Sequence, residues 1–145
     1  DKSDSRLHRV QIMLSVSYPK EIYRILKPDG IFITEQVGAL NDRDLVEQLY
    51  AVPPAPPFPR QHLKLFTREF QENNFSILDS CETFGTIRFW DVSALIWFAR
   101  VIEWEFPNFS VKNNLKQLFN IQKQLEKDGI IKGKTHRFLL IAKKK

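Results

Sequence analysis

The amino-acid sequence predicts an α/β fold, and three observations lead to that prediction. Short apolar runs rich in β-branched residues alternate along the chain with amphipathic stretches at helical spacing. Turns containing Pro, Gly or Asn separate these runs. The length of 145 residues is about that of one domain, and the hydrophobic residues, which make up 43% of the sequence, are ample for a core. The expected order is strand, helix, strand, helix, strand, a long helical stretch and a final strand, arranged as a three-layer sandwich.

The beginning of the chain contains a strand, a short helix and a second strand. Residues 10–16, VQIMLSV, form an apolar run short enough for a buried strand, although the same run could belong to a helix. A helix over 18–27 begins near Pro19 and is stopped by the turn Pro28–Gly30. Residues 31–37 follow as a strand that we expect to be covered on both faces, because the apolar residues of IFIT do not alternate with polar ones.

The remaining elements are predicted from caps, prolines and periodicity. Asn41 or Asp42 can cap a helix that runs to Tyr50. The proline-rich segment 53–60 is an extended loop, because proline fits neither a helix interior nor an inner strand. Recognition of this loop by a partner is the weaker interpretation, since its basic residue is misplaced for the usual ligand pattern. Later elements are a helix from Thr67, a strand over 75–83, an apolar helix over 91–106, a helix over 111–127 and a strand from His136.

Composition indicates a protein of a reducing, aqueous compartment. No run of 18 apolar residues is present, and the richest window, 92–106, is interrupted by charged residues, which disfavours a membrane span. The first ten residues lack the basic and apolar regions of a signal peptide. The single cysteine, Cys81, cannot form an internal disulfide. We therefore expect a cytoplasmic location.

The net charge of +5 raises the question of nucleic-acid binding. The lysines form a terminal run, Lys143 to Lys145, and are otherwise scattered between polar residues. This distribution favours a solvated basic surface over a binding stripe, so nucleic acid is not expected as a partner.

Several segments of the chain resemble class I S-adenosylmethionine-dependent methyltransferases. KEIYRILKPDGIFITEQVG, residues 20–38, resembles the helix after strand four and then strand five of that family, where LKPGG is the recurring form and Asp29 replaces the first glycine. FTREFQENNFSILD resembles the next helix and strand six, and HRFLLIAKKK resembles the antiparallel strand seven. RFWDVSALIWFARVIEWEFPNFSV and DGIIKGKTHRFLLIAKK resemble segments of a subgroup of uncharacterised bacterial members. The resemblance covers 18–145 and leaves 1–17 as a leader unlike the family, with one strand at most.

The resemblance implies a partial Rossmann-like sheet with strands ordered four, five, seven, six, and with strand seven antiparallel. It also implies a helical insertion between strands six and seven, residues 88–128, that covers the substrate. One sheet edge would remain unpaired where strand one of the family lies. Because such an edge is a template for further strands, we expect association with another copy or with a separate N-terminal piece, and a homo-oligomer if the fragment is stable alone.

S-adenosylmethionine is the cofactor that the resemblance implies, but the family's glycine-rich loop is absent from this chain. That loop lets backbone N–H groups approach the cofactor without side-chain obstruction, and no two of the five glycines are close enough to form it. We therefore expect the C-terminal, substrate-side portion of a methyltransferase, arising by truncation, by a disrupted reading frame or as a domain fragment. On its own it should bind the cofactor poorly or not at all, and be inactive.

The topology implied by the resemblance brings two groups of candidate residues to one rim. Ligands of open α/β sheets bind beyond the carboxyl ends of the parallel strands, where Gln36 and Asn41 lie. The antiparallel last strand begins at the same rim with His136 and Arg137. His136 could act as a general base, since imidazoles titrate near neutral pH, or could simply hold the strand by a hydrogen bond. Gln36 either contacts substrate or bonds the next loop.

The insertion supplies further candidates for substrate binding. Its three tryptophans, spaced seven residues apart, lie nearly on one helical face. They either stack against a flat substrate or, as the favoured interpretation, belong to the core. Arg100 and Glu103, at i, i+3 spacing, either orient polar groups of a substrate or pair with each other. The candidate residues of the insertion are Arg88, Trp97, Arg100 and Glu103.

Two functions from different classes remain after other chemistries are set aside. The histidines His8, His62 and His136 are far apart in sequence and no CxxC or HxxxH spacing occurs, so no metal site is expected. A serine hydrolase would need a G-x-S-x-G elbow, which is missing. The favoured function is methyl transfer to a small molecule, or less favourably to RNA. The alternative is a non-catalytic remnant or oligomerising binding module without cofactor, and the sequence does not identify the methyl acceptor.

Overall fold

A computed structural model describes residues 7–13 and 18–145 of the chain. The chain divides into two compact units, each built from segments that are distant in sequence. The first, here called the sheet unit, contains the described residues up to Ala39 together with Arg60–Thr83 and Arg137–Lys145. The second, the helical unit, contains Leu40–Pro59 and Phe84–His136. Among the described residues, no helix is long and apolar enough to cross a membrane.

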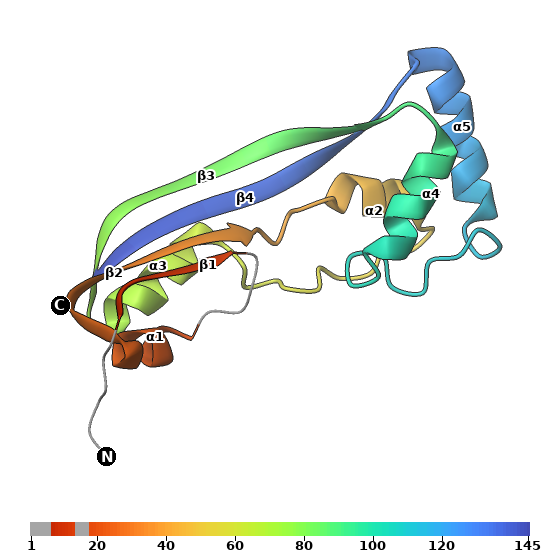
Figure 1. Ribbon diagram of the computed structural model, residues 1–145. Coiled ribbons are helices and arrows are strands. Elements are labelled where there is room, and N and C mark those ends of the chain that lie inside the picture. The colour runs from red at the N-terminus through yellow and green to blue at the C-terminus, as the bar shows by residue number, and fades with distance from the viewer. Residues whose placement is uncertain (1–6, 14–17) are drawn as a thin grey trace. The chain divides into compact units, whose positions relative to one another are not determined.

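The sheet has four strands in the order β1-β2-β4-β3 (Figure 1). β1 (Leu7–Met13) is parallel to β2 (Leu26–Val37), and β4 (Ile131–Lys144) is antiparallel to β2, with Val37 opposite Arg137. The outer strand is β3 (Phe75–Phe89). This order, with an antiparallel third strand, confirms the predicted partial Rossmann-like sheet. The strand expected over 10–16 is confirmed as far as Met13, and its residues 14–17 lie outside the described part of the chain.

A short helix and a tight turn connect the two parallel strands. α1 (Pro19–Ile25) has Pro19 in its first turn and ends where Leu26 adopts an extended conformation. Between the pairs Leu7–Leu26 and Arg9–Ile31, β2 contains extra residues, including Asp29 with a positive φ of 62°. A Cβ atom at Gly30 would lie 2.8 Å from the carbonyl oxygen of Lys27. Gly30 is therefore required by the close approach of the backbone at this turn.

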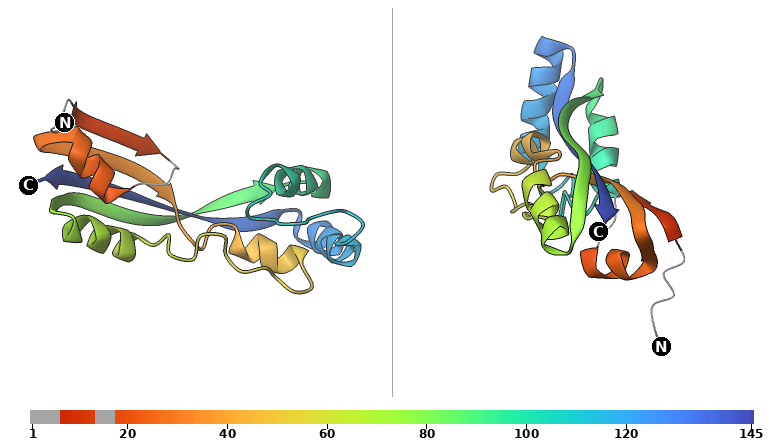
Figure 2. Two further views of the ribbon diagram at one scale, coloured as in Figure 1. Left: turned by 90° about the horizontal axis from the view of Figure 1, so that it is seen from below. Right: turned by 90° about the vertical axis from the view of Figure 1, so that its left-hand side faces the viewer.

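One face of the sheet unit is covered by helices. α1 and α3 (Leu63–Glu72) lie on the same side of the sheet (Figure 2). The aromatic ring of Phe32 stacks on Phe70 with centroids 5.0 Å apart, so β2 and α3 are in direct contact. The buried core comprises Ile22, Leu26, Phe32, Phe66, Phe70, Phe75, Phe138, Leu140 and Ala142.

The other face of this sheet is only half-buried. Along β2, buried residues such as Phe32 alternate with half-buried ones such as Ile31 and Ile33, and β4 shows the same alternation at Leu139 and Ile141. The expectation of a strand covered on both faces, in a three-layer sandwich, is therefore wrong for the described part of this unit. The run IFIT carries apolar residues to both faces, but only one face meets helices of the unit.

Three helices and the ends of two strands build the helical unit: α2 (Arg43–Leu49), α4 (Val92–Val101), α5 (Leu115–Asp128), β3 and β4. The carboxylate of Asp91 accepts a hydrogen bond of 2.7 Å from the backbone N–H of Ala94 and caps α4. Gly129, with a φ of 71°, ends α5. The core comprises Leu45, Val46, Leu49, Phe89, Leu95, Ala99, Phe106, Leu118, Ile121 and Ile131.

Several helices and strands begin or end at other residues than the sequence predicts. β3 continues to Phe89 and β4 begins at Ile131, so both strands are longer than expected. Gly85 lies against Thr135 and Gly133 against Ile87, as in an antiparallel pair, and this pairing keeps polar residues in extended conformation. α4 ends at Val101, before the predicted end at Phe106, and α5 begins at Leu115.

Candidate functional site

The helical unit holds a buried polar cluster where the segment after β2 meets β4. His136 is 1% exposed, and its Nδ1 accepts a hydrogen bond of 3.2 Å from the backbone N–H of Leu40. The backbone N–H of His136 donates to Oδ1 of Asn41 at 3.1 Å. The amide of Asn41 in turn donates to Oδ2 of Asp42 at 2.6 Å. We call Leu40, Asn41, Asp42, Phe84 and His136 the His136 cluster.

The start of α2 holds this cluster against β4. Asp42 adopts a left-handed conformation with a φ of 54°, and its backbone N–H donates to the carbonyl of Lys134 at 2.9 Å. Oδ1 of Asp44 accepts from the backbone N–H groups of Leu45 and Lys134, both at 3.0 Å. Asp42 is the N-cap residue of α2, but its side chain makes no capping hydrogen bond. Asp42 therefore occupies the predicted N-cap position without the capping hydrogen bond, and its Oδ2 accepts from Asn41 instead.

The ring of His136 also has an aromatic neighbour. Phe84 of β3 stacks on it with centroids 4.5 Å apart and an interplanar angle of 19°. Because Nδ1 accepts a backbone hydrogen bond, the neutral ring carries its proton on Nε2, which makes Nε2 a donor. The role of His136 as a general base stays a prediction.

Gln36 and Arg137 belong to the sheet unit. Gln36 is 1% exposed, and its amide donates to Oγ1 of Thr34 at 2.7 Å and accepts from Gln61 at 3.2 Å. Gln61 also accepts a backbone hydrogen bond of 2.8 Å from Ala39, so this loop is fixed to the end of β2. A hydrogen bond from Gln36 to the next loop is one of the two roles that the sequence predicts for this residue. Arg137 is half-buried and pairs with Val37 in the β2–β4 register.

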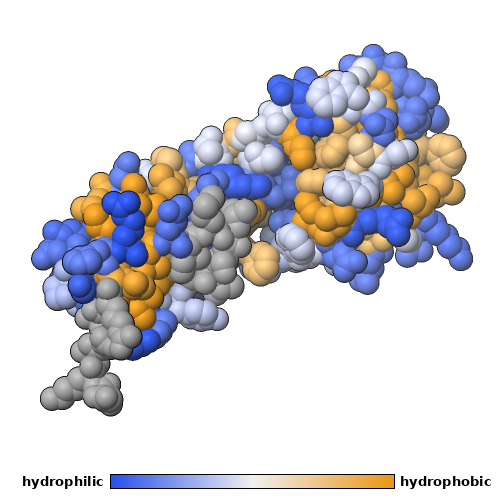
Figure 3. Space-filling view, viewed as in Figure 1, coloured by the Kyte–Doolittle hydropathy of each residue, from blue (hydrophilic) through white to orange (hydrophobic). Residues whose placement is uncertain are grey.

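The tryptophans of the insertion are exposed. Trp90, Trp97 and Trp104 have exposed fractions of 70%, 67% and 59%, so their prediction as core residues is wrong. The core of the unit instead takes the opposite side of α4, with Leu95 and Ala99 fully buried. Apolar residues are visible at the surface of each unit (Figure 3). Such exposure of large aromatic rings is uncommon in a soluble domain and is a feature of contact surfaces.

The charged candidates of the insertion are exposed as well. Arg88 lies on β3, whereas Arg100 shares a surface hollow with Ser93, Ile96, Trp97 and Val101. Arg100 also lines a second hollow, with Glu103 and the turn that follows it. The structure thus brings Arg100 together with Trp97 in one hollow and with Glu103 in another, and brings Asn41 and His136 together in the His136 cluster.

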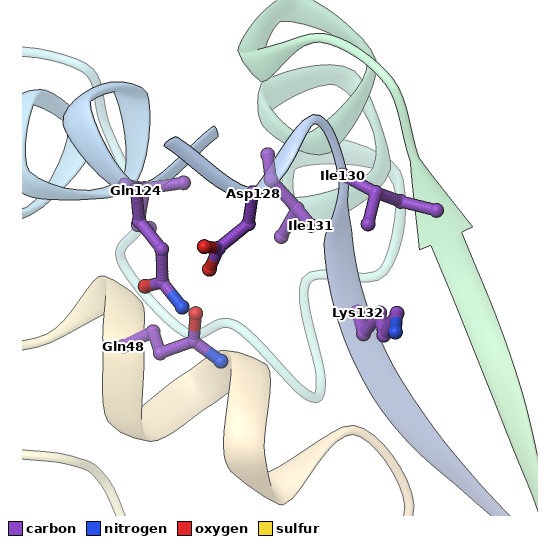
Figure 4. A pocket seen from close by; sticks show the side chains of 7 residues that line it. Gln48, Gln124, Asp128, Ile130, Ile131 and Lys132 are labelled. Carbon is purple, nitrogen blue, oxygen red and sulfur yellow. The ribbon is translucent and has the colours of Figure 1, made fainter. Parts of the chain in front are cut away.

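A further hollow lies between α2, α5 and β4. Figure 4 shows the side-chain amides of Gln48 and Gln124 close to the carboxylate of Asp128, with Lys132 on the neighbouring strand. Nε2 of Gln48 donates to the carbonyl of Asp44 at 3.0 Å. The sequence carried no signal for this site, because polar side chains on a helix surface are expected anywhere. Among the described residues, no group of three His, Cys, Asp or Glu side chains could hold a metal ion.

Sequence analysis also missed several buried polar residues of the helical unit. Asp42, Glu105 and Asn114 are 2%, 5% and 6% exposed. The amide of Asn114 donates to the carbonyl of Leu49 at 2.8 Å, which ties α5 to α2. The hydroxyl of Tyr50 donates to the carbonyl of Pro107 at 3.0 Å, and burial raises the pKa of Tyr50 to about 12. The N-cap position of Asp42 was predicted, and that of Asn114 could have been anticipated from the start of α5.

Among the comparisons with known proteins, only the one with solved structures found similar proteins. No family model matches the chain, and no curated protein matches it significantly. A candidate methyltransferase from Bacillus halodurans C-125 is 17% identical with a TM-score of 0.57, over 98% of this chain and 71% of that chain. The cyclase SpnF is 15% identical with a TM-score of 0.47, over 97% of this chain and 50% of that chain. A Haemonchus contortus phosphoethanolamine N-methyltransferase, in complex with phosphomonomethylethanolamine and S-adenosylhomocysteine, is 13% identical with a TM-score of 0.42, over 99% of this chain and 35% of that chain.

The described strands and helices therefore share the fold of the Bacillus halodurans candidate methyltransferase. The Bacillus halodurans structure shares this arrangement over nearly the whole of the present chain. The chain spans 71% of that protein and half or less of the other two.

Proposed function

We propose that this chain is the substrate-side portion of an S-adenosylmethionine-dependent methyltransferase that acts on a small molecule. The observation that carries the proposal is the fold shared with the Bacillus halodurans candidate methyltransferase, including the antiparallel strand β4 beside β2. The position of the polar residues supports it. Asn41 follows the carboxyl end of β2, which is where ligands of open α/β sheets bind.

The chain's own residues would contact the methyl acceptor. In the His136 cluster, Phe84, which is 55% exposed and stacks on His136, would offer an apolar surface. At α4, Trp97, Arg100 and Glu103 would contribute an aromatic face and two charges. S-adenosylmethionine would supply the methyl group. The residues of this chain do not fit that cofactor, because they contain no glycine-rich loop.

The proposal extends to location and partners. A small molecule is favoured over RNA as acceptor, because the lysines are scattered over the sequence and form no stripe. A single cysteine supports a cytoplasmic location. The second candidate function is a non-catalytic binding module, which is favoured by the missing loop and by the exposed tryptophans.

Isothermal titration with S-adenosylmethionine separates these possibilities. The 145-residue chain and the product of its whole coding region should be titrated side by side. We expect no micromolar binding by the chain, and micromolar binding by a product that carries a glycine-rich loop in frame. Micromolar binding by the chain alone would contradict its assignment as a portion without the cofactor site. A whole product that neither binds the cofactor nor contains the loop would support the binding module.

A further inference from the structure

The hollow at the end of α4 contains two opposite charges that do not pair with each other. It is lined by Arg100 and Glu103 and by the turn Phe106–Phe109. Neither charged side chain has a hydrogen bond or ion pair with any residue that the structure describes. Both are exposed, so both are available to a ligand.

Helix geometry explains why these charges stay apart. Glu21 and Arg24 have the same three-residue spacing inside α1, and their side chains are 2.6 Å apart. α4 ends at Val101, however, and the chain turns between Arg100 and Glu103. Arg100 therefore projects from the last helical turn, and Glu103 belongs to the turn that follows.

The apolar wall of the hollow is rigid. Phe106 is 1% exposed and packs edge-on against Phe98 with centroids 6.0 Å apart. Phe109 packs against Tyr50 at 6.5 Å, and the hydroxyl of Tyr50 donates to the carbonyl of Pro107 at 3.0 Å. These contacts hold the turn in place before any ligand arrives, which reduces the entropy lost on binding.

The chemistry of this hollow defines the ligand that it fits. A guanidinium recognises a carboxylate, a carboxylate recognises an ammonium group, and aromatic rings accept an apolar body. We propose that the hollow binds a small zwitterion that carries a carboxylate, an ammonium group and an apolar or aromatic side group. Only the identification of this ligand as the methyl acceptor rests on the proposed function; the binding itself needs no cofactor.

Three probes that differ in one charge test the proposal. L-phenylalanine carries both charges, 3-phenylpropanoate carries only the carboxylate, and 2-phenylethylamine carries only the ammonium group. Each probe is titrated into the 145-residue chain, and dissociation constants are taken from two-dimensional NMR, with the indole N–H signals of Trp97 and Trp104 as local reporters. We expect saturable binding of all three, with L-phenylalanine binding most tightly.

Variants that each remove one of the two charges should weaken the binding of different probes. R100Q should weaken the binding of L-phenylalanine and 3-phenylpropanoate by about three- to tenfold and leave the binding of 2-phenylethylamine unchanged. E103Q should weaken the binding of L-phenylalanine and 2-phenylethylamine by a similar factor and leave the binding of 3-phenylpropanoate unchanged. K116Q and E47Q are matched controls for the loss of one charge, because Lys116 and Glu47 are exposed residues of the same unit outside the hollow.

Two results would overturn the proposal. One is the absence of saturable binding of every probe up to its solubility limit. The other is that R100Q and E103Q weaken the binding of all probes alike, or weaken it no more than K116Q and E47Q do. Neither result bears on methyl transfer, since S-adenosylmethionine is not present in these titrations.

Discussion

The ring of His136 accepts the backbone N–H of Leu40 at Nδ1, with 3.2 Å between the two nitrogen atoms. This hydrogen bond joins β4 to the segment before α2, and it determines which ring nitrogen carries the proton. The same ring is buried and stacked on Phe84, so its removal affects both polar and apolar contacts.

His136→Ala should therefore lower the free energy of unfolding by about 2–4 kcal/mol, from the lost acceptor and the lost stacking. His136→Asn should cost less, because its Oδ1 occupies nearly the position of Nδ1 and still accepts from Leu40. Urea unfolding of the two variants checks this difference. Equal losses would show that the hydrogen bond to Leu40 contributes little.

Gly133→Ala should destabilise the helical unit by about 1–3 kcal/mol. A Cβ atom at this position would lie 2.5 Å from Cδ1 of Leu45 and 3.0 Å from Cγ2 of Ile87. In a Leu45→Ala background the same substitution should cost clearly less, because the clashing atoms of Leu45 are gone and only the contact with Ile87 remains. Thermal unfolding of both single variants and the double variant measures this coupling, and strictly additive effects would argue against the clash.

Lys144→Met should lower the free energy of unfolding by about 1–3 kcal/mol. Nζ of Lys144 donates to the carbonyls of Tyr23 and Leu26 at 2.6 and 2.7 Å, and it lies 4.2 Å from the centroid of the Tyr23 ring. The neighbouring Lys143→Met is the control. Lys143 pairs with Asp29 at 2.8 Å, but the two side chains are 40% and 80% exposed, so its loss should cost about 0–1 kcal/mol. Chemical denaturation should rank the two variants in this order, and the reverse order would contradict the role of Lys144.

The contribution of Tyr50 to stability should disappear at high pH. Burial raises the pKa of Tyr50 to about 12, so the unfolded chain loses this proton at lower pH than the folded chain does. The unfolded state then binds fewer protons, and stability falls as pH rises from about 10 toward 12. We expect the stability difference between the native chain and Tyr50→Phe to be constant up to about pH 9 and to shrink above pH 10. Because the lysines titrate in both proteins, only this difference is informative, and a constant difference at pH 11 would contradict the prediction.

The exposed tryptophans should contribute little to folding. Trp97→Ala should change the free energy of unfolding by no more than about 0.5 kcal/mol, whereas Phe106→Ala should cost about 3–5 kcal/mol. Acrylamide should quench most of the tryptophan fluorescence of the native chain, because all three indoles are accessible. A blue-shifted emission that resists quenching would mean that these rings are covered in solution.

The sequence predicted the strand order and the meeting of Asn41 with His136. Both follow from the resemblance to methyltransferases, whose antiparallel last strand begins at the rim where β2 ends. The lengths of β3 and β4 did not follow, because their polar middle residues have little strand propensity of their own. Pairing between the two strands keeps those residues extended.

Burial was harder to predict than secondary structure. The tryptophans repeat at a spacing typical of a helical core, yet the smaller residues Leu95 and Ala99 take the buried side of α4. The hydrogen bond of Asp44 to Lys134 joins residues 90 positions apart, and no local pattern encodes such a contact. Periodicity assigns a face to a helix, whereas the partner of that face is decided by the rest of the chain.

Neither compact unit is a continuous stretch of sequence, and the backbone passes from one to the other four times, after Ala39, Pro59, Thr83 and His136. Any single protease cut between residues 41 and 135 consequently leaves pieces of both units in each fragment. The gene cannot be divided at one point into two independently folding halves. Truncation at any point between Leu45 and Ile131 would divide both cores at once.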